Sequence, residues 1–418
     1  MTSPVQPVQP VQPVQPVQPA LPEAPGYGRD SIADVLTSSA AALGAAGFSN
    51  VLNIASTKRI CVVLADGLGK AMLKQRAAHA PFLRQVMNAA ANGGPDHAHQ
   101  QTLTAAFPST TVTSLTSLGT GVVPGQHGMV GYDVLDPGQD KVVNLLGNWD
   151  PGVDPETWQP FPTVFERLQG TVPTATISLP KFAASPMTRA ALRGGTFVGA
   201  STAHARTEAA AELMAANDQM LLYFYWSELD KAGHGHGSTS ERWEHQLEEL
   251  DAAMKRLATQ LPADTVILLT ADHGMVDVAE RWRIDYSAEP ELTAGVRHTA
   301  GEPRMVHLYL EPDADVAQRE RLVDSWLRRY GNKAWVLTRE QAVRAGFFGP
   351  VRPEVLPRIG DVLVAAREPV AFFDTRRIRP AALEVVGQHG SLTRAEREVP
   401  LLRIPMQHAS AARKSRRG

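Results

Sequence analysis

Three short apolar runs in this chain each end near an acidic residue, and this pattern constrains the fold more than any other feature. The runs extend from Ile60 to Ala65, from Leu221 to Trp226 and from Val266 to Thr270. Each has the length and the β-branched or aromatic content of a buried strand, and helical patterns separate them. This alternation predicts an α/β fold in which helices sandwich a mainly parallel sheet.

The acidic residues that follow the three runs are Asp66, Asp230 and Asp272. In an open parallel sheet, the carboxyl ends of the strands point into one crevice. We therefore expect these three carboxylates to converge there, although they come from distant parts of the sequence.

Two of these carboxylates have a histidine close by in the sequence. His234 follows Asp230 by four residues in a glycine-rich segment, and His273 directly follows Asp272. Zinc accepts both carboxylate oxygen and imidazole nitrogen as ligands. Taken alone, each pair is also compatible with a loop or turn that carries exposed polar side chains.

Asp66 is followed by Gly67-Leu68-Gly69, which allows the backbone to approach an ion or a phosphate closely. The alternative is that Asp66 caps a helix expected from Lys70 to His79.

The segment from Phe107 to Gly121 is dense in hydroxyl side chains. A hydroxyl bound to a metal ion becomes a better nucleophile because the ion favours the alkoxide. A helix that begins directly after such a residue would also direct its free N–H groups toward an anionic substrate. For all but one of these residues, packing or helix capping is the simpler interpretation.

The complete set of motifs resembles the alkaline phosphatase superfamily, and more narrowly its type I phosphodiesterase/nucleotide pyrophosphatase branch. The resemblance covers roughly residues 55 to 405. The motifs, in order, are Asp66-Gly, Pro108-Ser-x-Thr111, Thr120-Gly121 with His127-Gly128, Asp230-x-x-x-His234, Asp272-His273-Gly and Gln388-His389-Gly. Their combination is far more specific than any one of them.

The resemblance implies a hydrolase of phosphate esters that uses two zinc ions and a phosphothreonine intermediate. It implies that one zinc is bound by Asp230, His234 and His389. It implies that the other is bound by Asp66, Asp272, His273 and the oxygen of Thr111. Thr111 would also be the nucleophile, with Thr110 as the alternative. The competing functions are a phosphomonoesterase, a phosphonate hydrolase and a zinc-binding pseudoenzyme.

The chain departs from this family's pattern after His127-Gly128. Many nucleotide pyrophosphatases have an asparagine there that donates to the phosphoryl oxygen, whereas this chain has Tyr132-Asp133. Asn144 and Asn148 are nearby in sequence, but structural roles are the better interpretation for both. Substrate preference is therefore left open by the motifs.

Other polar residues fall outside the metal pattern. His236, His298 and His307 are expected to be surface or structural residues. Arg304 is a candidate substrate contact from a cap subdomain.

The chain is expected to contain one catalytic domain between two tails. Residues 1–25 contain a Pro-Val-Gln repeat and are expected to be a disordered tail, and residues 409–418 form a basic tail. The catalytic domain would span residues 26–408, with a cap inserted at roughly 288–385.

Several elements are expected within this domain. The hydrophobic spacing predicts a helix from Glu241 to Leu261. Within the cap, we expect a strand from Met305 to Leu310 and a helix from Val316 to Tyr330.

Composition limits the kinds of partner that this chain is expected to bind. The net charge of −2 gives no general attraction to nucleic acid, and no apolar stretch is as long as a membrane span. The single cysteine, Cys61, lies in an apolar run and is expected to be buried. We expect a cytoplasmic protein whose partner is a small phosphodiester or nucleotide.

Overall fold

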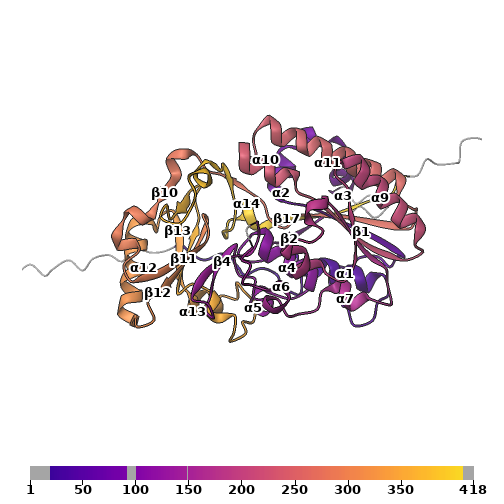
Figure 1. The fold of residues 1–418 in the computed structure, drawn as a ribbon. Coiled ribbons are helices and arrows are strands. Elements are labelled where there is room, and N and C mark those ends of the chain that lie inside the picture. The colour runs from indigo at the N-terminus through magenta and orange to yellow at the C-terminus, as the bar shows by residue number, and fades with distance from the viewer. Residues whose placement is uncertain (1–18, 92–99, 148, 408–418) are drawn as a thin grey trace, which may run out of the picture.

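The computed structural model describes residues 19–91, 100–147 and 149–407. Within these residues, the chain forms a central seven-stranded sheet with the order β2-β17-β8-β1-β7-β5-β6. Figure 1 shows this sheet in the larger part of the molecule, around the label of β1. The strands are β2 (Gln100–Thr104), β17 (Glu398–Ile404), β8 (Thr265–Thr270), β1 (Arg59–Ala65), β7 (Met220–Trp226), β5 (Thr174–Ser178) and β6 (Thr196–Gly199). Strand β17 is antiparallel to β8 and β2, whereas β8, β1, β7, β5 and β6 run parallel.

The three predicted apolar runs form the centre of this sheet. Strand β1 lies between β8 and β7, with Leu64 opposite both Thr270 and Tyr225. Every residue of β1 is buried, because helices cover both faces of the sheet. Cys61 is among these residues, and its burial raises the pKa of the thiol to about 12. The three strands therefore end side by side at one edge.

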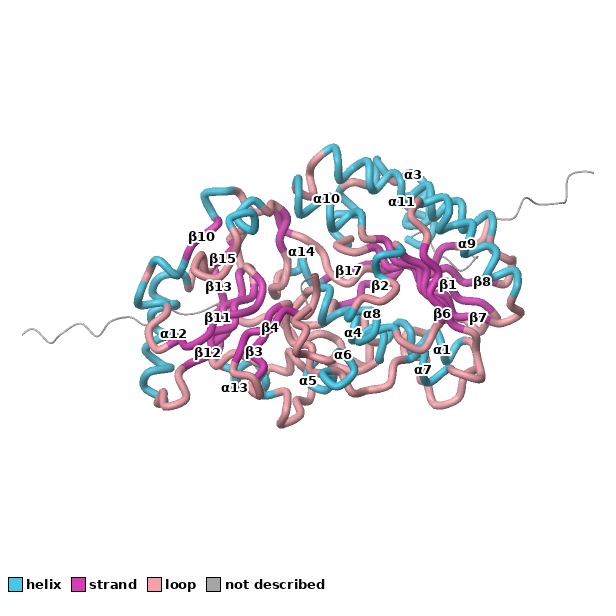
Figure 2. The backbone as a smooth tube through the Cα atoms, viewed as in Figure 1, coloured by secondary structure: helices cyan, strands magenta, loops and turns pink. Residues whose placement is uncertain are grey.

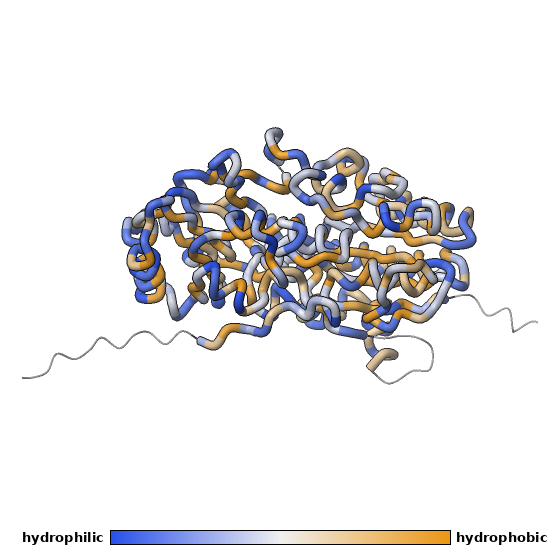
Figure 3. Tube along the Cα trace, turned by 90° about the horizontal axis from the view of Figure 1, so that it is seen from below, coloured by the Kyte–Doolittle hydropathy of each residue, from blue (hydrophilic) through white to orange (hydrophobic). Residues whose placement is uncertain are grey.

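Helices lie on both sides of the central sheet (Figures 1 and 2). One layer contains α2 (Lys70–Gln75), α3 (Pro81–Ala91), α9 (Ala203–Ala216), α10 (Glu228–His236) and α11 (Glu241–Gln260). The other layer contains α1 (Asp34–Ala42), α4 (Thr111–Thr120), α7 (Val164–Leu168) and α8 (Pro186–Leu192). The predicted α/β sandwich is confirmed. Hydrophobic segments concentrate inside it, and hydrophilic ones are frequent at the periphery (Figure 3).

The helix predicted from Glu241 matches α11 closely. Its apolar stripe is buried, including Trp243 and Leu257, and Ser240 caps its N-terminus by accepting a hydrogen bond from the Trp243 N–H. The amphipathic spacing was informative here because one face packs on the protein body and the other meets water.

A smaller antiparallel sheet lies beside the main body. Among the described residues it has four strands, in the order β11-β12-β14-β13. The strands are β11 (Val296–Glu302), β12 (Met305–Leu310), β14 (Val362–Ala366) and β13 (Ala334–Thr338). Helix α12 (Val316–Tyr330) packs on this sheet through a second hydrophobic cluster that includes Trp326 and Phe372. The strand and helix predicted in this region are confirmed.

Shorter elements complete the fold. They are β3 (Asp133–Asp136), β4 (Lys141–Asn144), β9 (Val276–Asp277), β10 (Arg283–Asp285), β15 (Ala371–Phe373), β16 (Gly387–Gln388), α5 (Pro124–His127), α6 (Pro155–Trp158), α13 (Arg339–Arg344) and α14 (Arg394–Arg397). Strands β3 and β4 form a separate hairpin that packs against β11, although it precedes β11 by more than a hundred residues in the sequence.

The predicted tails lie largely outside the described residues. Of the segment 1–25, the structure describes residues from Pro19 onward, and Leu21 and Ala24 pack against the core. The predicted borders of the cap, 288 and 385, stay predictions. None of the helices in the described ranges is long and apolar enough to cross a membrane.

Candidate metal centre

The adjacent strands β8, β1 and β7 bring three carboxylates to one edge of the central sheet. Asp66 directly follows β1, Asp230 lies in the first turn of α10 just after β7, and Asp272 follows β8 by two residues. The Gly67 N–H donates to Asp272 Oδ1 over 3.1 Å, which ties the ends of β1 and β8 together. The predicted convergence of the three carboxylates is therefore observed.

His389 reaches the same place through a short strand pairing. It follows β16, in which Gln388 lies opposite Val276 of β9. Val276 comes three residues after His273 in the sequence. Its ring stacks on the His273 ring with a centroid separation of 3.6 Å. The last motif of the sequence thus joins the others in space.

Asp66, Asp272 and His273 form one group with the spacing of a metal site. Their ligand atoms lie within 4.8 Å of one another. His273 Nε2 is 3.4 Å from Asp66 Oδ1 and 3.5 Å from Asp272 Oδ2. The Thr111 hydroxyl completes this side of the site, because its Oγ1 lies 3.2 Å from His273 Nε2.

Asp230, His273 and His389 form a second group that satisfies the same 4.8 Å criterion. His389 Nε2 is 4.0 Å from Asp230 Oδ1, and His234 Nε2 is 3.3 Å from Asp230 Oδ2. The family resemblance implied His234, rather than His273, as the third member of this group. In the structure Asp230 contacts His234 and lies close to His389, and His273 stands between the two groups.

Each of the three histidines places its Nδ1 on a backbone carbonyl. The Nδ1 atoms of His234, His273 and His389 lie 2.7, 2.9 and 3.0 Å from the oxygens of Gly387, Gly274 and Ser109. A carbonyl accepts but cannot donate, so Nδ1 carries the proton and Nε2 faces the carboxylates. Metal-binding histidines are commonly oriented in this way.

The protein leaves the hydrogen bonding of these carboxylates incomplete. Asp66 Oδ1, Asp230 Oδ1 and Asp272 Oδ2 are buried and lack a hydrogen-bond partner within the described residues. Burial, followed by repulsion from Asp272 and Asp230, raises the pKa of Asp66 well above its usual value. Buried carboxylates without partners are costly, and a bound cation would remove that cost.

The same charges also shift the pKa values of two of the histidines. Burial opposes protonation of His234, but attraction to Asp230 outweighs it and raises the His234 pKa to about 9. Burial, together with His273 and His234, holds the pKa of His389 well below its usual value. The donor set of imidazoles, carboxylates and a hydroxyl fits the ligands that zinc accepts.

The hydroxyl of Thr111 stands at the start of a helix. Helix α4 begins at Thr111 itself, with Thr110 in extended conformation at the N-cap position. The first N–H groups of a helix have no partner inside it, so they are available to an anion near Thr111. Next to Thr110, the Ser109 N–H donates to Gly390 and the Ser109 hydroxyl donates to Ser391, which ties this loop to the His389 segment.

Comparison with known proteins places this chain in a family. The family model described as type I phosphodiesterase / nucleotide pyrophosphatase matches residues 60–392. The chain belongs to this family. Among curated protein sequences, none is significantly similar to it.

Solved structures share the fold of this phosphodiesterase family member. Murine ectonucleotide pyrophosphatase / phosphodiesterase 5, an inactive variant in complex with AMP, is 16% identical with a TM-score of 0.62, over 82% of this chain and 87% of that one. Phosphonoacetate hydrolase from Sinorhizobium meliloti 1021, in complex with phosphonoacetate, is 18% identical with a TM-score of 0.60, over 85% and 91%. At these identities the likeness establishes the fold.

Several polar residues singled out in the sequence have structural positions in this family member. His127 accepts a hydrogen bond at Nδ1 from the Met129 N–H, so Nε2 carries the proton and donates to Ser117 Oγ over 2.9 Å. Asn144 donates to Asp133 and accepts from the Leu146 N–H, as expected for a structural residue. Asn148 lies outside the described residues.

The unmatched histidines also make contacts away from the metal ligands. His236 lies 3.2 Å from an Arg242 nitrogen, and His298 lies 3.1 Å from Asp140. His307 is buried and accepts from the Gly360 N–H.

Two sequence interpretations were wrong. Arg304 does not reach a substrate, because it is fully buried and pairs with Glu396 over 2.8 Å. Asp66 does not cap the helix after β1, because Gly69 occupies the N-cap position of α2 without any side-chain hydrogen bond. That helix ends at Gln75, and a separate 3-10 turn covers Ala77–His79.

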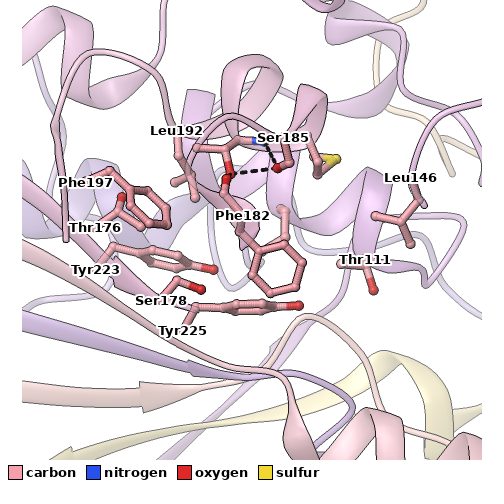
Figure 4. Close-up of a pocket in the computed structure, with 13 residues that line it drawn as sticks. Thr111, Leu146, Thr176, Ser178, Phe182, Ser185, Leu192, Phe197, Tyr223 and Tyr225 are labelled. Atoms are coloured by element: carbon pink, nitrogen blue, oxygen red, sulfur yellow. Dashed lines mark hydrogen bonds between the residues drawn. The ribbon is translucent and has the colours of Figure 1, made fainter. Parts of the chain in front are cut away.

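An apolar cavity next to Thr111 was missed by the sequence analysis (Figure 4). Its empty space, including the mouth, is about 450 Å³. The described residues that line it are uncharged: Thr111, Leu115, Leu146, Thr176, Ser178, Phe182, Ser185, Met187, Thr188, Leu192, Phe197, Tyr223 and Tyr225. Tyr223 and Tyr225 alternate along β7, which places both rings on one face of the sheet. That alternation was the available signal.

Proposed function

We propose that this chain is a two-zinc hydrolase of phosphate esters, most specifically a phosphodiesterase or nucleotide pyrophosphatase that works through a phosphothreonine intermediate. One observation carries the proposal. The hydroxyl of Thr111, at the start of a helix, lies 3.2 Å from His273 Nε2. In the same cluster, three aspartates each keep one buried oxygen without a hydrogen-bond partner among the described residues. Membership of the phosphodiesterase family supports the same reaction class.

The residues of the site have the following proposed roles. Asp66, Asp272, His273 and Thr111 would hold one ion, and Asp230, His234 and His389 the other. When bound, these ions would supply positive charge that favours the Thr111 alkoxide and offsets charge on the phosphoryl oxygens. The start of α4 presents N–H groups to the same oxygens. Thr111 Oγ1 forms a bond to phosphorus, the ester oxygen departs, and water then cleaves the phosphothreonine.

The cavity favours an ester that carries an apolar or aromatic group. Phe182, Tyr223 and Tyr225 provide flat apolar walls beside Thr111. Ser178 Oγ and the Tyr223 hydroxyl are buried and lack hydrogen-bond partners within the described part of the chain. A flat group with a polar edge would satisfy them, as the base of a nucleotide does. The cytoplasmic location and the small-molecule partner expected from the sequence stay predictions.

A phosphonate hydrolase is the second candidate. The structure of phosphonoacetate hydrolase with phosphonoacetate has a similar fold and favours it. Phosphonoacetate carries a carboxylate next to its phosphonate, however, and the described lining of the cavity offers that carboxylate no cation. The phosphodiester is therefore the better substrate for this cavity.

The test begins with metal analysis and with turnover of bis(4-nitrophenyl) phosphate, 4-nitrophenyl phosphate and phosphonoacetate. We expect two zinc ions per chain and the highest kcat/KM for the diester. Thr111→Ala should reduce turnover at least about 10³-fold while both ions remain bound, because it removes the nucleophile.

Thr110→Ala is the matched control, since the neighbouring hydroxyl would be the nucleophile if the sequence were aligned one residue earlier. It should retain most of the activity, and mass spectrometry of the quenched reaction should place the phosphate on Thr111. Two bound ions without turnover of any ester would identify a pseudoenzyme instead.

A further inference from the structure

Tyr225 lies where the apolar cavity meets the metal centre. It stands in β7 opposite Leu64 of β1, and the Asp66 N–H donates to the Trp226 oxygen over 2.8 Å. Asp66 is two residues beyond Leu64, which places its side chain on the same face of the sheet as Tyr225. The Tyr225 hydroxyl donates a hydrogen bond to Asp66 Oδ2.

This hydrogen bond gives the two oxygens of Asp66 different partners. Oδ2 accepts from Tyr225, whereas Oδ1 is 3.4 Å from His273 Nε2 and has no hydrogen-bond partner within the described residues. A carboxylate held at one oxygen cannot rotate freely about its last torsion. The Tyr225 hydroxyl thus leaves Oδ1 directed at the place where Asp272 and His273 converge. Partners of this kind orient metal ligands in many proteins.

The ring of Tyr225 has a second set of contacts. It packs edge-on against Phe182 with a centroid separation of 5.8 Å and stacks on Tyr223 at 6.2 Å. Figure 4 shows the phenol oxygen of Tyr225 turned toward the Thr111 side of the cavity. The ring therefore forms a wall for the ester group, and the hydroxyl contacts a metal ligand.

We propose that Tyr225 is a positioning residue, whose hydroxyl holds Asp66 in the orientation that binds the ion next to Thr111. The inference rests on the proposed function, because it concerns the same metal centre. The hydroxyl and the ring of Tyr225 would then have separate roles. The hydroxyl sets metal affinity and kcat, and the ring sets the fit of the apolar ester group.

The test compares Tyr225→Phe with Tyr223→Phe, two variants that each remove one oxygen atom from neighbouring rings of the cavity. Tyr223 is a suitable control because its hydroxyl is buried without a hydrogen-bond partner within the described residues. Zinc affinity is measured by competition with a chromogenic chelator, without substrate. Tyr225→Phe should weaken the affinity of one of the two sites about 10- to 100-fold. Tyr223→Phe should change neither site more than about twofold.

Kinetics at saturating zinc provide the second measurement. Tyr225→Phe should lower kcat for an aromatic diester several-fold and leave KM within about twofold, because the ring remains in place. A role in packing alone would instead lower the melting temperature of the metal-free protein and leave zinc affinity unchanged. That result, or equal losses of affinity in both variants, would overturn the inference.

Wild-type titration separates this inference from the proposed function. If the wild type binds no zinc, the proposed function fails. If the wild type binds two ions and Tyr225→Phe binds them equally well, only the role of Tyr225 fails. Should Tyr225→Phe not fold, 3-fluorotyrosine placed at position 225 keeps the hydroxyl. Its fluorine resonance should shift on zinc addition, and an unchanged resonance would overturn the inference.

Discussion

Arg304 and Glu396 bury a pair of opposite charges, whereas Asp66, Asp230 and Asp272 bring three carboxyl groups close together. Both oxygens of Glu396 accept from Arg304 over 2.8 Å, and the Ser391 N–H donates to the same carboxylate. The Arg304 guanidinium also donates to carbonyls, including those of Glu368 and Val370. The three aspartates each retain a buried oxygen without such a partner among the described residues.

This difference in hydrogen bonding helps to distinguish a structural buried charge from one that indicates a binding site. A charge whose hydrogen bonds are completed by the chain itself is part of the scaffold. A charge that the fold leaves incomplete has a cost that a bound cation or a shift of its pKa removes. Arg304 therefore stabilises the junction between the smaller sheet and the main body, and the aspartates indicate a cation site.

Asp66→Asn tests the incomplete cluster and should have the largest effect. We expect turnover to fall at least about 10³-fold and the stabilisation of the protein by zinc to decrease, because a ligand charge is lost. The metal-free variant should melt at or above the wild-type temperature, since one repelling carboxylate is gone. Activity assays and melting curves with and without a chelator measure these effects.

Asp218→Asn provides a control for Asp66→Asn, because Asp218 is an exposed aspartate on the loop before β7. It should leave both turnover and the response to zinc unchanged. A metal-free Asp66→Asn protein that melts well below the wild type would show that Asp66 is a scaffold charge, and the contrast with Arg304 would then fail.

Arg304→Met tests the completed pair. It leaves the Glu396 carboxylate buried without its guanidinium, which typically costs about 3–5 kcal/mol in the free energy of unfolding. Denaturant unfolding of the metal-free protein measures the loss. The double variant Arg304→Met with Glu396→Leu should recover much of it, because no unpaired charge remains. The folded fraction of Arg304→Met should bind zinc with wild-type affinity, and weaker binding would place Arg304 in the function after all.

The contrast also explains which features the sequence could predict. Strand ends are local, so the apolar runs before Asp66, Asp230 and Asp272 were enough to place these residues at one edge. The order of the motifs then indicated Thr111 and His389. The partner of Arg304 is 92 residues away along the chain, and no local pattern signals such a pairing.

Tyr225 was missed for a related reason. It lies inside the apolar run from Leu221 to Trp226, where composition indicates burial and nothing more. Its hydrogen bond to Asp66 depends on the register between β7 and β1, in which Tyr225 lies opposite Leu64. Register is a property of the assembled sheet, so the hydrogen bond from Tyr225 to Asp66 could be recognised only in the structure.

Glu302 provides the most sensitive test of the comparison, because it is a buried carboxylate outside both groups. Its Oε1 accepts from the Tyr132 N–H over 2.6 Å, and its Oε2 has no hydrogen-bond partner within the described residues. Burial, opposed by the Tyr132 hydrogen bond, raises the pKa of Glu302 to about 8. With this raised pKa, the Glu302 carboxyl is expected to be protonated at neutral pH.

The pH dependence of stability follows from that raised pKa. The folded state binds one more proton than the unfolded state between the usual glutamate pKa and about 8, so stability falls as pH rises through this window. The loss between pH 6 and pH 8 should be about 2 kcal/mol. Glu302→Gln should remove it, because the amide stays neutral, whereas Glu291→Gln at an exposed site should retain it. Denaturant unfolding of the metal-free proteins at both pH values measures the difference. Equal slopes in the wild type and Glu302→Gln would mean that the fold accepts Glu302 as an anion. An unpartnered buried oxygen would then not by itself identify a cation site, and the case for the aspartate cluster would rest on its histidines and on Thr111.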